Sequence, residues 1–253
     1  MKASESNPNY PSKVREMTNY TIREIKKVCK DIGPRPSGEE NERKAQDYVA
    51  DSMSKVADSV VKEKFELHPK AFMGWVPLDV ILMTISIVLT LLSYFDVLPS
   101  ASTAFSVVSV VLTSLAIIFT FFEFLLYKKF LDPFFPKRET YNVVCTRKAA
   151  GETKRRIVFS GHIDSAYEWY FTHLGGGKLL TTMIALAFGA IAITLAASIV
   201  SFFDVPNGVR VTAIVVLFVC LIPILMCSMF VNWKLCVPGA NDLSLIHISE
   251  PTR

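Results

Sequence analysis

The chain has 253 residues, 51% of them hydrophobic, and a formal net charge of +4 at pH 7. Ordinary globular proteins contain about 45–50% apolar residues. The mean hydropathy of this chain is positive, so its composition argues against a purely soluble protein. The length suits one sizeable α/β domain or two small ones. The mild basic excess gives no reason to expect a nucleic-acid partner.

The surplus of apolar residues falls in four runs without charged side chains. Three of them reach or exceed the roughly 20 residues that cross a bilayer core, and Trp75, Val76 and Leu78 extend the shorter first run. A spanning segment must be helical here, because every backbone N–H and C=O inside a bilayer needs an internal partner. We therefore predict four transmembrane helices in two hairpins, the alternative being a very apolar soluble core. The runs are Val80–Phe95, Val97–Phe122, Leu179–Phe203 and Val211–Trp233.

Basic residues predict the orientation of these helices. The opening segment Met1–Tyr20 lacks the apolar core of a signal peptide, so the first run is expected to act as the insertion signal. The hairpin tips carry only Asp96, Asp204 and Arg210, whereas basic residues gather on the opposite side, which predicts that this side is cytoplasmic. The five cysteines, an odd number, show no disulfide framework. The basic residues are Lys70, Lys128, Lys129, Lys137, Arg138, Lys178 and Lys234.

The polar segments between the hairpins are expected to meet as one discontinuous domain, because each hairpin leaves and re-enters the membrane on the same side. The fold class predicted is α/β, a mixed sheet with flanking helices that two transmembrane hairpins interrupt. We divide the chain into polar segments 1–75, 128–177 and 234–242, transmembrane hairpins 76–127 and 178–233, and a tail, 243–253.

Local patterns predict the elements of the polar segments. Thr18–Lys30 carries the apolar stripe of a helix, which the glycine and prolines of Gly33–Pro36 end. Ser37 and Glu40 fit a capping box at the start of a second helix. Three short runs rich in β-branched and aromatic residues predict strands, and the last two are expected to form a hairpin. These runs are Ser59–Leu67, Tyr141–Arg147 and Arg155–Ser160.

The first chemistry-bearing motif is Gly161-His162-Ile163-Asp164-Ser165, which follows directly on the last predicted strand. Ligands tend to bind at such a strand end. The neutral imidazole of His162 is a good zinc ligand, and the Asp164 carboxylate could fix the tautomer of a ligand histidine. Taken alone, the triplet also fits a surface histidine at the end of a strand.

The second motif is Pro238-Gly239-Ala240-Asn241-Asp242, a turn-forming stretch whose final carboxylate could bridge two cations. A plain loop with one acidic residue is the alternative. Without the hairpin Lys178–Lys234, about 23 residues separate His162 from Asp242, a natural distance for two neighbouring strand-end loops.

Together these features resemble metallopeptidase family twenty-eight, the zinc aminopeptidase and carboxypeptidase family that also includes glutaminyl cyclases and the transferrin receptor. The resemblance covers about half of the chain and none of the four apolar runs. Its carriers are Ile32–Gly38 through Tyr48–Ala50, Tyr141–Val144 through Gly161–Ser165, and Pro238–Asp242.

The resemblance implies a role for each matched residue. His162 would bind one zinc ion, Asp164 would orient a ligand without binding zinc, and Asp242 would bridge two zinc ions. The activity implied is hydrolysis of a peptide bond, with an aminopeptidase as the favoured form. The family also uses a Glu-Glu pair with the catalytic glutamate, a further acidic ligand and a histidine, none of which matches here, and Leu243 replaces the usual Asn or Asp. We therefore expect little zinc affinity and no turnover from this chain.

The tail Leu243–Arg253 matches, codon for codon, the translation of a transposase-end sequencing adapter. We therefore leave it out of the fold prediction, and we do not count His247 as a zinc ligand. The natural gene is expected to continue past Asp242.

Two other classes of function remain open. One is a non-catalytic relative that keeps the domain as a binding module, as the transferrin receptor does, although the retention of His162 and Asp164 argues against it. The other is a transporter or membrane scaffold, against which the lack of intramembrane charge pairs argues. The expected partners are the lipid bilayer and a peptide substrate, and the sequence favours no particular oligomeric state.

Overall fold

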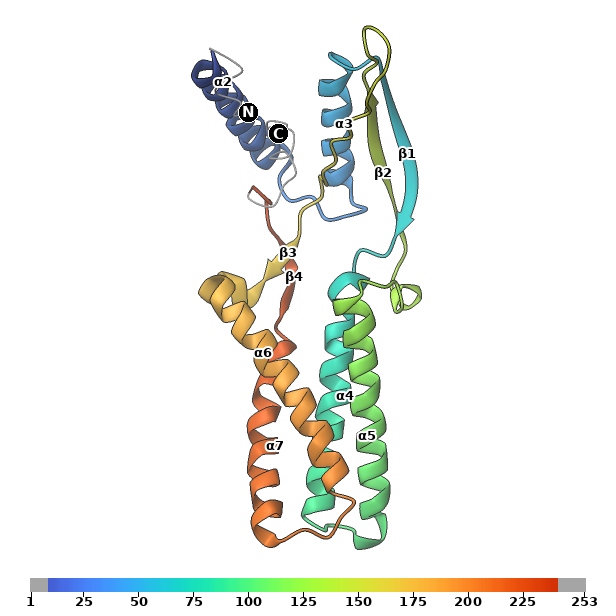
Figure 1. Cartoon of the computed structure of the whole chain (residues 1–253), viewed down its shortest axis with the longest axis vertical. Coiled ribbons are helices and arrows are strands. Elements are labelled where there is room, and N and C mark those ends of the chain that lie inside the picture. Colours follow the sequence, from blue (N-terminus) through green and yellow to red (C-terminus); the bar gives the residue numbers. More distant parts are fainter. Residues whose placement is uncertain (1–8, 241–253) are drawn as a thin grey trace. The chain divides into compact units, whose positions relative to one another are not determined.

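Segments that lie far apart in the sequence fold into two units (Figure 1). The computed structural model describes residues 9–240. The first of the two units, which we call the polar unit, comprises Met1–Pro69, Lys137–Tyr167 and Trp233–Arg253. The second, the helical unit, comprises Lys70–Pro136 and Glu168–Asn232.

Two helices begin the polar unit. Helix α2 spans Tyr10–Lys27 and so begins earlier than the predicted Thr18. A proline lies in its first turn, where the missing N–H would have no helical partner in any case. It continues as a π-turn, Val28–Ile32, which ends at Gly33. The φ of Gly33 is +79°, a value that glycine adopts without strain. Helix α3 follows at Glu40–Ser54.

The capping box predicted for α3 is wrong. The N-cap residue is Glu39, and no side chain caps the helix. The hydroxyl of Ser37 instead donates a hydrogen bond to Asp164, on a distant segment of the chain. The backbone N–H of Gly38 donates to Glu42 Oε2 at 2.7 Å, so the carboxylate that closes this turn is that of Glu42 and not that of Glu40.

A two-stranded antiparallel sheet packs against α3. Strand β1, Ser59–Leu67, pairs with β2, Arg138–Thr146, from Ser59 opposite Thr146 to Leu67 opposite Arg138. Thr140 on β2 donates to Glu42 on α3 at 2.7 Å and accepts from Gln46 at 2.9 Å. Burial of Glu42 raises the pKa of its carboxyl above the ordinary value, and the bonds from Thr140 and Gly38 oppose that shift.

The hairpin predicted between Tyr141–Arg147 and Arg155–Ser160 is also wrong. Residues 152–166 form no strand, and Ile157, Val158 and Phe159 are 68%, 78% and 63% exposed. β2 pairs with β1 instead, although helices α4 and α5 separate the two strands in sequence. Ion pairs across this sheet, such as Lys64 Nζ to Glu139 Oε1 at 2.6 Å, support the observed pairing.

Within residues 9–240, four helices of the helical unit are long and apolar enough to cross a membrane, as predicted. A short 3₁₀ turn, Pro99–Ala101, precedes α5, and a π-turn, Thr120–Leu125, extends it. Helix α6 is kinked at Gly175 and Gly176, the second of which has a φ of +64°. The helices are α4 Ala71–Tyr94, α5 Ser102–Phe119, α6 Tyr170–Val200 and α7 Asn207–Cys227.

The end of the fourth apolar run differs from the prediction. α7 stops at Cys227, and Val231–Trp233 belongs to strand β4, Val231–Cys236. β4 pairs with the short strand β3, Tyr167–Trp169, in a second two-stranded sheet. The division between the two units runs through both of these strands.

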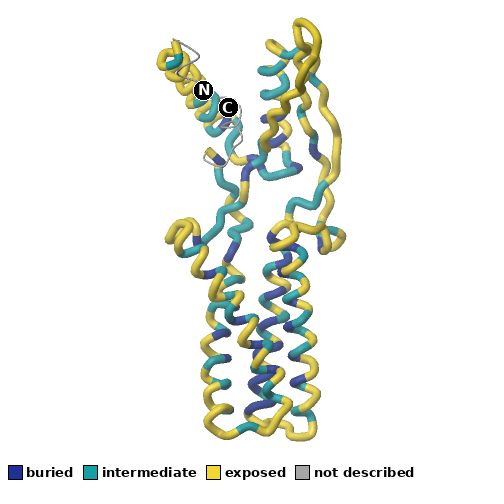
Figure 2. The backbone as a smooth tube through the Cα atoms, viewed as in Figure 1, coloured by how far each residue is buried: buried dark blue, intermediate teal, exposed yellow. Residues whose placement is uncertain are grey.

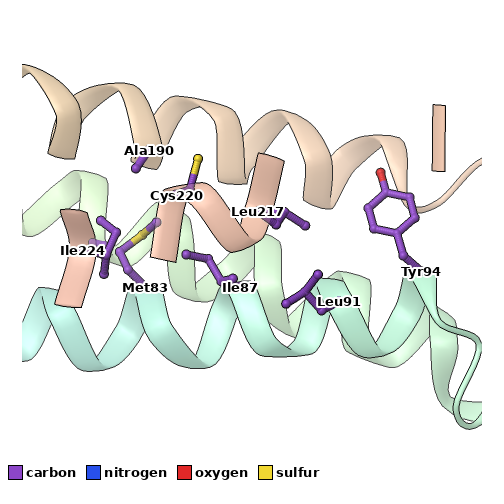
Figure 3. Close-up of a cluster of buried hydrophobic side chains, with 9 residues drawn as sticks. Met83, Ile87, Leu91, Tyr94, Ala190, Leu217, Cys220 and Ile224 are labelled. Carbon is purple, nitrogen blue, oxygen red and sulfur yellow. The ribbon is translucent and has the colours of Figure 1, made fainter. Parts of the chain in front are cut away.

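The helical unit contains a cluster of buried apolar side chains. Residues of α4, α6 and α7 point toward one another in Figure 3, and the Tyr94 hydroxyl donates to the Ala197 carbonyl at 2.9 Å. The outward faces of the four helices are mostly exposed in Figure 2. Apolar side chains can remain on those faces because lipid tails are as apolar as they are. The cluster comprises Met83, Ile87, Leu91, Tyr94, Ala116, Ala190, Leu217, Cys220 and Ile224.

A buried network of hydroxyl groups joins three of the helices. Ser109 Oγ on α5 lies 2.6 Å from Ser86 Oγ and 2.6 Å from Thr90 Oγ1, both on α4. It also lies 2.6 Å from Ser198 Oγ on α6. Small hydroxyl side chains let helices approach closely and bond across the interface, which is how helices associate when lipid surrounds them. Ser109 is therefore the centre of the polar contact between α4, α5 and α6.

We expect the substitution Ser109→Ala to lower the free energy of unfolding by about 0.6–1.7 kcal/mol, because it removes hydrogen bonds between helices. The measurement is denaturant unfolding of the purified full chain in micelles, followed by helical circular dichroism. The matched control is Ser114→Ala on the same helix, whose hydroxyl bonds only to the Val110 carbonyl at 2.7 Å. Equal losses in the two variants would contradict the role given to the network.

Candidate functional site

The side chain of Arg35 is the centre of the candidate site in the polar unit. It follows the turn at Gly33 and is fully buried. Its Nε donates to the carbonyl of Ile163 at 3.0 Å, its Nη2 to the carbonyl of Pro238 at 2.8 Å, and its Nη1 to the carbonyl of Gly33. A guanidinium has five N–H donors in a fixed plane, so it can hold several carbonyls at once. Arg35 thus links three segments that are far apart in the sequence.

The backbone of Arg35 adds a second pair of bonds to the first motif. Its N–H donates to Ser165 Oγ at 2.8 Å, and its carbonyl accepts from the N–H of Ser165 at 2.9 Å. Ser165 is itself buried. These reciprocal bonds fix the end of the Gly161–Ser165 segment although no strand precedes it.

The predicted zinc ligand and its partner lie together in this segment. His162 Nδ1 and Asp164 Oδ1 are 3.0 Å apart, and Ser37 Oγ donates to the other carboxylate oxygen, Oδ2. The carboxylate therefore holds the imidazole on one side and is itself held on the other. The side chain of His162 is 54% exposed, so its second ring nitrogen, Nε2, can bind a ligand from outside.

The second predicted motif begins beside the first. The carbonyl of Pro238 accepts from Arg35 Nη2 and, at 3.6 Å, from the thiol of Cys29. The N–H of Val237 donates to the carbonyl of Ala166 at 3.0 Å. The predicted bridging ligand, Asp242, and the excluded His247 lie outside the described residues. The described start of the motif, at Pro238, therefore lies beside Arg35, and the position of Asp242 stays a prediction from sequence.

Two thiols share the surroundings of Arg35. Cys236 Sγ lies 3.2 Å from Ser165 Oγ. Burial raises the pKa of the Cys236 thiol, and the bond to Ser165 and the charge of Arg35 oppose that shift. Burial also lowers the pKa of the Arg35 guanidinium, while Cys29, Cys236 and Asp164 act in the opposite direction. The raised pKa leaves the partly buried Cys236 with a smaller thiolate fraction than a free cysteine, which makes it a weaker nucleophile.

The donor set within residues 9–240 fits zinc only in part. His162, backed by a carboxylate, has the arrangement in which proteins present an imidazole to zinc. No group of three or more His, Cys, Asp or Glu side chains that could hold a metal ion occurs in the described part of the chain. A tetrahedral zinc site needs three or four protein ligands, so these residues alone do not complete one.

Sequence patterns pointed to His162 and Asp164 but missed the roles of Arg35 and Ser37. The signal for Arg35 was a single charged residue between two prolines, Pro34 and Pro36. A second histidine–carboxylate pair lies in the helical unit, where His173 Nδ1 is 3.4 Å from Glu168 Oε1. Asp79, which directly precedes the apolar run Val80–Phe95, lies inside α4 and is buried.

We expect Arg35→Lys to loosen the polar unit, because an ammonium has its three donors on one nitrogen, whereas Arg35 reaches the three carbonyls from three different nitrogens. Each buried carbonyl left unpaired costs about 1–3 kcal/mol. The measurement is amide hydrogen exchange of the full chain in micelles, with faster exchange expected at Ser165 and Val237. The control is Arg43→Lys, an exposed position on α3. Unchanged exchange in the Arg35 variant would show that the guanidinium does not hold these segments.

A scan of protein-family models, a search of curated proteins and a search of solved structures each found no match for this chain. A function is therefore proposed from the resemblance of three sequence segments and from the chemistry of the residues around Arg35.

Proposed function

We propose that this chain is part of a membrane-anchored, two-zinc metallopeptidase that hydrolyses peptide bonds, with an aminopeptidase as the favoured form. The polar unit would carry the metal site in a zinc-aminopeptidase-like domain, and the four apolar helices would anchor it in the bilayer. The proposal rests on the resemblance of three sequence segments to metallopeptidase family twenty-eight.

The observation that carries the proposal is the contact between His162 Nδ1 and Asp164 Oδ1 at 3.0 Å. Zinc ligands of the histidine type usually donate their other ring N–H to a carboxylate, which fixes the tautomer and raises the basicity of the ligand nitrogen. Ser37 holds the same carboxylate from its other oxygen, so the imidazole is oriented before any metal binds.

A second support is that the three segments of the resemblance meet at one side chain. Arg35 belongs to the first segment, donates to Ile163 in the second and donates to Pro238 in the third. Segments that share a metal site must lie close together, and chance matches would have no reason to do so.

The roles of the individual residues are those that the resemblance implies. His162 would bind one zinc ion through Nε2, Asp164 would orient the imidazole, and Asp242 would bridge two zinc ions. Zinc, when bound, would lower the pKa of a water molecule and polarise the scissile carbonyl. This chain by itself is expected to bind zinc weakly and to show no turnover, because no residue matches the catalytic glutamate.

The placement of the polar unit in the cytoplasm is part of the proposal. Its support is the excess of basic residues on one side of the two hairpins. The expected partners are the bilayer and a peptide substrate.

A non-catalytic role is the second candidate. The absence of a group of three donor side chains within residues 9–240 favours a membrane protein that uses a peptidase-like domain only for binding.

The two candidates differ in one feature of the gene. We expect the reading frame after the codon for Asp242 to encode a Glu-Glu pair, then an acidic residue and a histidine, and a frame without them would exclude the peptidase.

We expect Asp164→Asn to weaken zinc binding by the full chain about 10–100-fold, as the loss of a carboxylate behind a ligand histidine does elsewhere. His162→Ala should weaken it further by removing the ligand itself. The measurement is competition with a chromophoric zinc chelator, which reads affinity and needs no turnover. The control is Asp51→Asn on the exposed face of α3. Equal affinity in the wild type and in both His162 and Asp164 variants would refute the metal site.

A further inference from the structure

The helical unit contains a carboxylate that the proposed peptidase does not use. Asp79 lies inside α4 and is only 6% exposed. Its Oδ2 accepts a hydrogen bond from Thr120 Oγ1 at 2.6 Å. Its Oδ1 is buried and has no hydrogen-bond partner among the described residues. One oxygen of this carboxylate, Oδ2, therefore accepts a hydrogen bond, and the other, Oδ1, accepts none from the described residues.

A carboxylate in this position is costly. Acidic residues inside membrane helices are costly and rare, and they usually pair with one another or line a pathway or a ligand site. No lysine or arginine within the described range forms an ion pair with Asp79. The helix thus keeps a group that lowers its own stability and that packing alone does not explain.

Asp79 forms part of the wall of a partly enclosed cavity of about 80 Å³ in the helical unit. Residues of α4, α6, α7 and the π-turn that follows α5 surround it, and apart from Asp79 and Thr120 the wall is almost wholly apolar. One water molecule needs roughly 10–15 Å³ on this scale, so a group of several heavy atoms can enter. The cavity is small for a large polar head group.

Aromatic rings on the same wall favour a cation. The ring centroids of Trp75 and Phe124 are 6.2 Å apart, and those of Phe124 and Phe188 are 6.1 Å apart. These three side chains and Phe230 all line the cavity. Aromatic faces attract ammonium groups, most strongly where water is excluded, and rings of this kind form the sites that recognise quaternary ammonium ligands.

We propose that this cavity binds the ammonium group of an amphiphile dissolved in the bilayer. The carboxylate supplies the opposite charge, the aromatic rings supply cation–π contacts, and the apolar wall accepts the first methylene groups of the ligand. Oδ1 exposes almost no surface to the cavity, so the carboxyl group turns about its Cβ–Cγ bond, a torsion with a broad energy minimum, to reach the ligand. This site lies within the helical unit and does not depend on the zinc site.

The test uses the full chain in maltoside micelles, whose head groups carry no charge and no amine. Dodecyltrimethylammonium is the probe and dodecanol is its uncharged counterpart. Trp75 lines the cavity, so its fluorescence reports binding, and the signal should disappear in Trp75→Phe. We expect saturable binding of the ammonium that is about tenfold or more weaker in Asp79→Asn, while binding of the alcohol changes little.

Two further variants test whether weaker ammonium binding in Asp79→Asn results only from loss of the fold. Phe124→Leu keeps the carboxylate and should weaken the ammonium but not the alcohol. Asp204→Asn, an exposed carboxylate between α6 and α7, should leave the affinity for both probes unchanged. Equal affinity of the wild type for both probes would mean that the cavity takes apolar chains only, and this result overturns the proposal. Absence of saturable ammonium binding to the wild type also overturns it.

Discussion

The guanidinium of Arg35 is the interaction on which the polar unit depends. A buried charge is stable only when its donors are used, and here they are used on backbone carbonyls from three separate segments. Carbonyls are present at every residue, so the bonds place no demand on the side chains of those segments. The bonds form only if the main chain of each segment follows a path that brings its carbonyl to the guanidinium. The end of the first motif, at Ser165, and the start of the second, at Pro238, are therefore fixed without a continuous sheet beneath them.

That rigidity bears on the chemistry of the proposed site. An imidazole is useful to a metal only if it is held in one orientation and one tautomer. His162 is held by Asp164, Asp164 by Ser37, and the segment that carries both is held by Arg35 and Ser165. This is a chain of bonds in which each residue is positioned by the next. The first segment of the resemblance, before the first membrane hairpin, thus supports residues that lie after it.

The helical unit obeys a different constraint. Lipid provides no hydrophobic force between helices, so the contacts that associate them must come from close packing and from hydrogen bonds. Ser86, Ser109 and Ser198 supply the hydrogen bonds on three helices. They satisfy one another, whereas the Oδ1 atom of Asp79 has no partner within residues 9–240. This difference separates a polar network that stabilises the fold from a polar atom that the described residues leave unpaired.

Sequence periodicity and composition were sufficient to predict the four apolar helices, strand β1 and most of β2, because bilayer length and side-chain alternation are local properties. The presence of His162 and Asp164 in one short motif could also be read locally. The partner of β2 could not be predicted locally, because helices α4 and α5 separate β1 from β2 in the sequence. Nearness in sequence favoured Arg155–Ser160 instead. The capping pattern at Ser37 failed for the same reason, since the hydroxyl found a better acceptor on a distant segment. The burial of Arg35 and Asp79 was decided only by the tertiary structure, because burial depends on what packs around a residue, and those neighbours are far away in the chain.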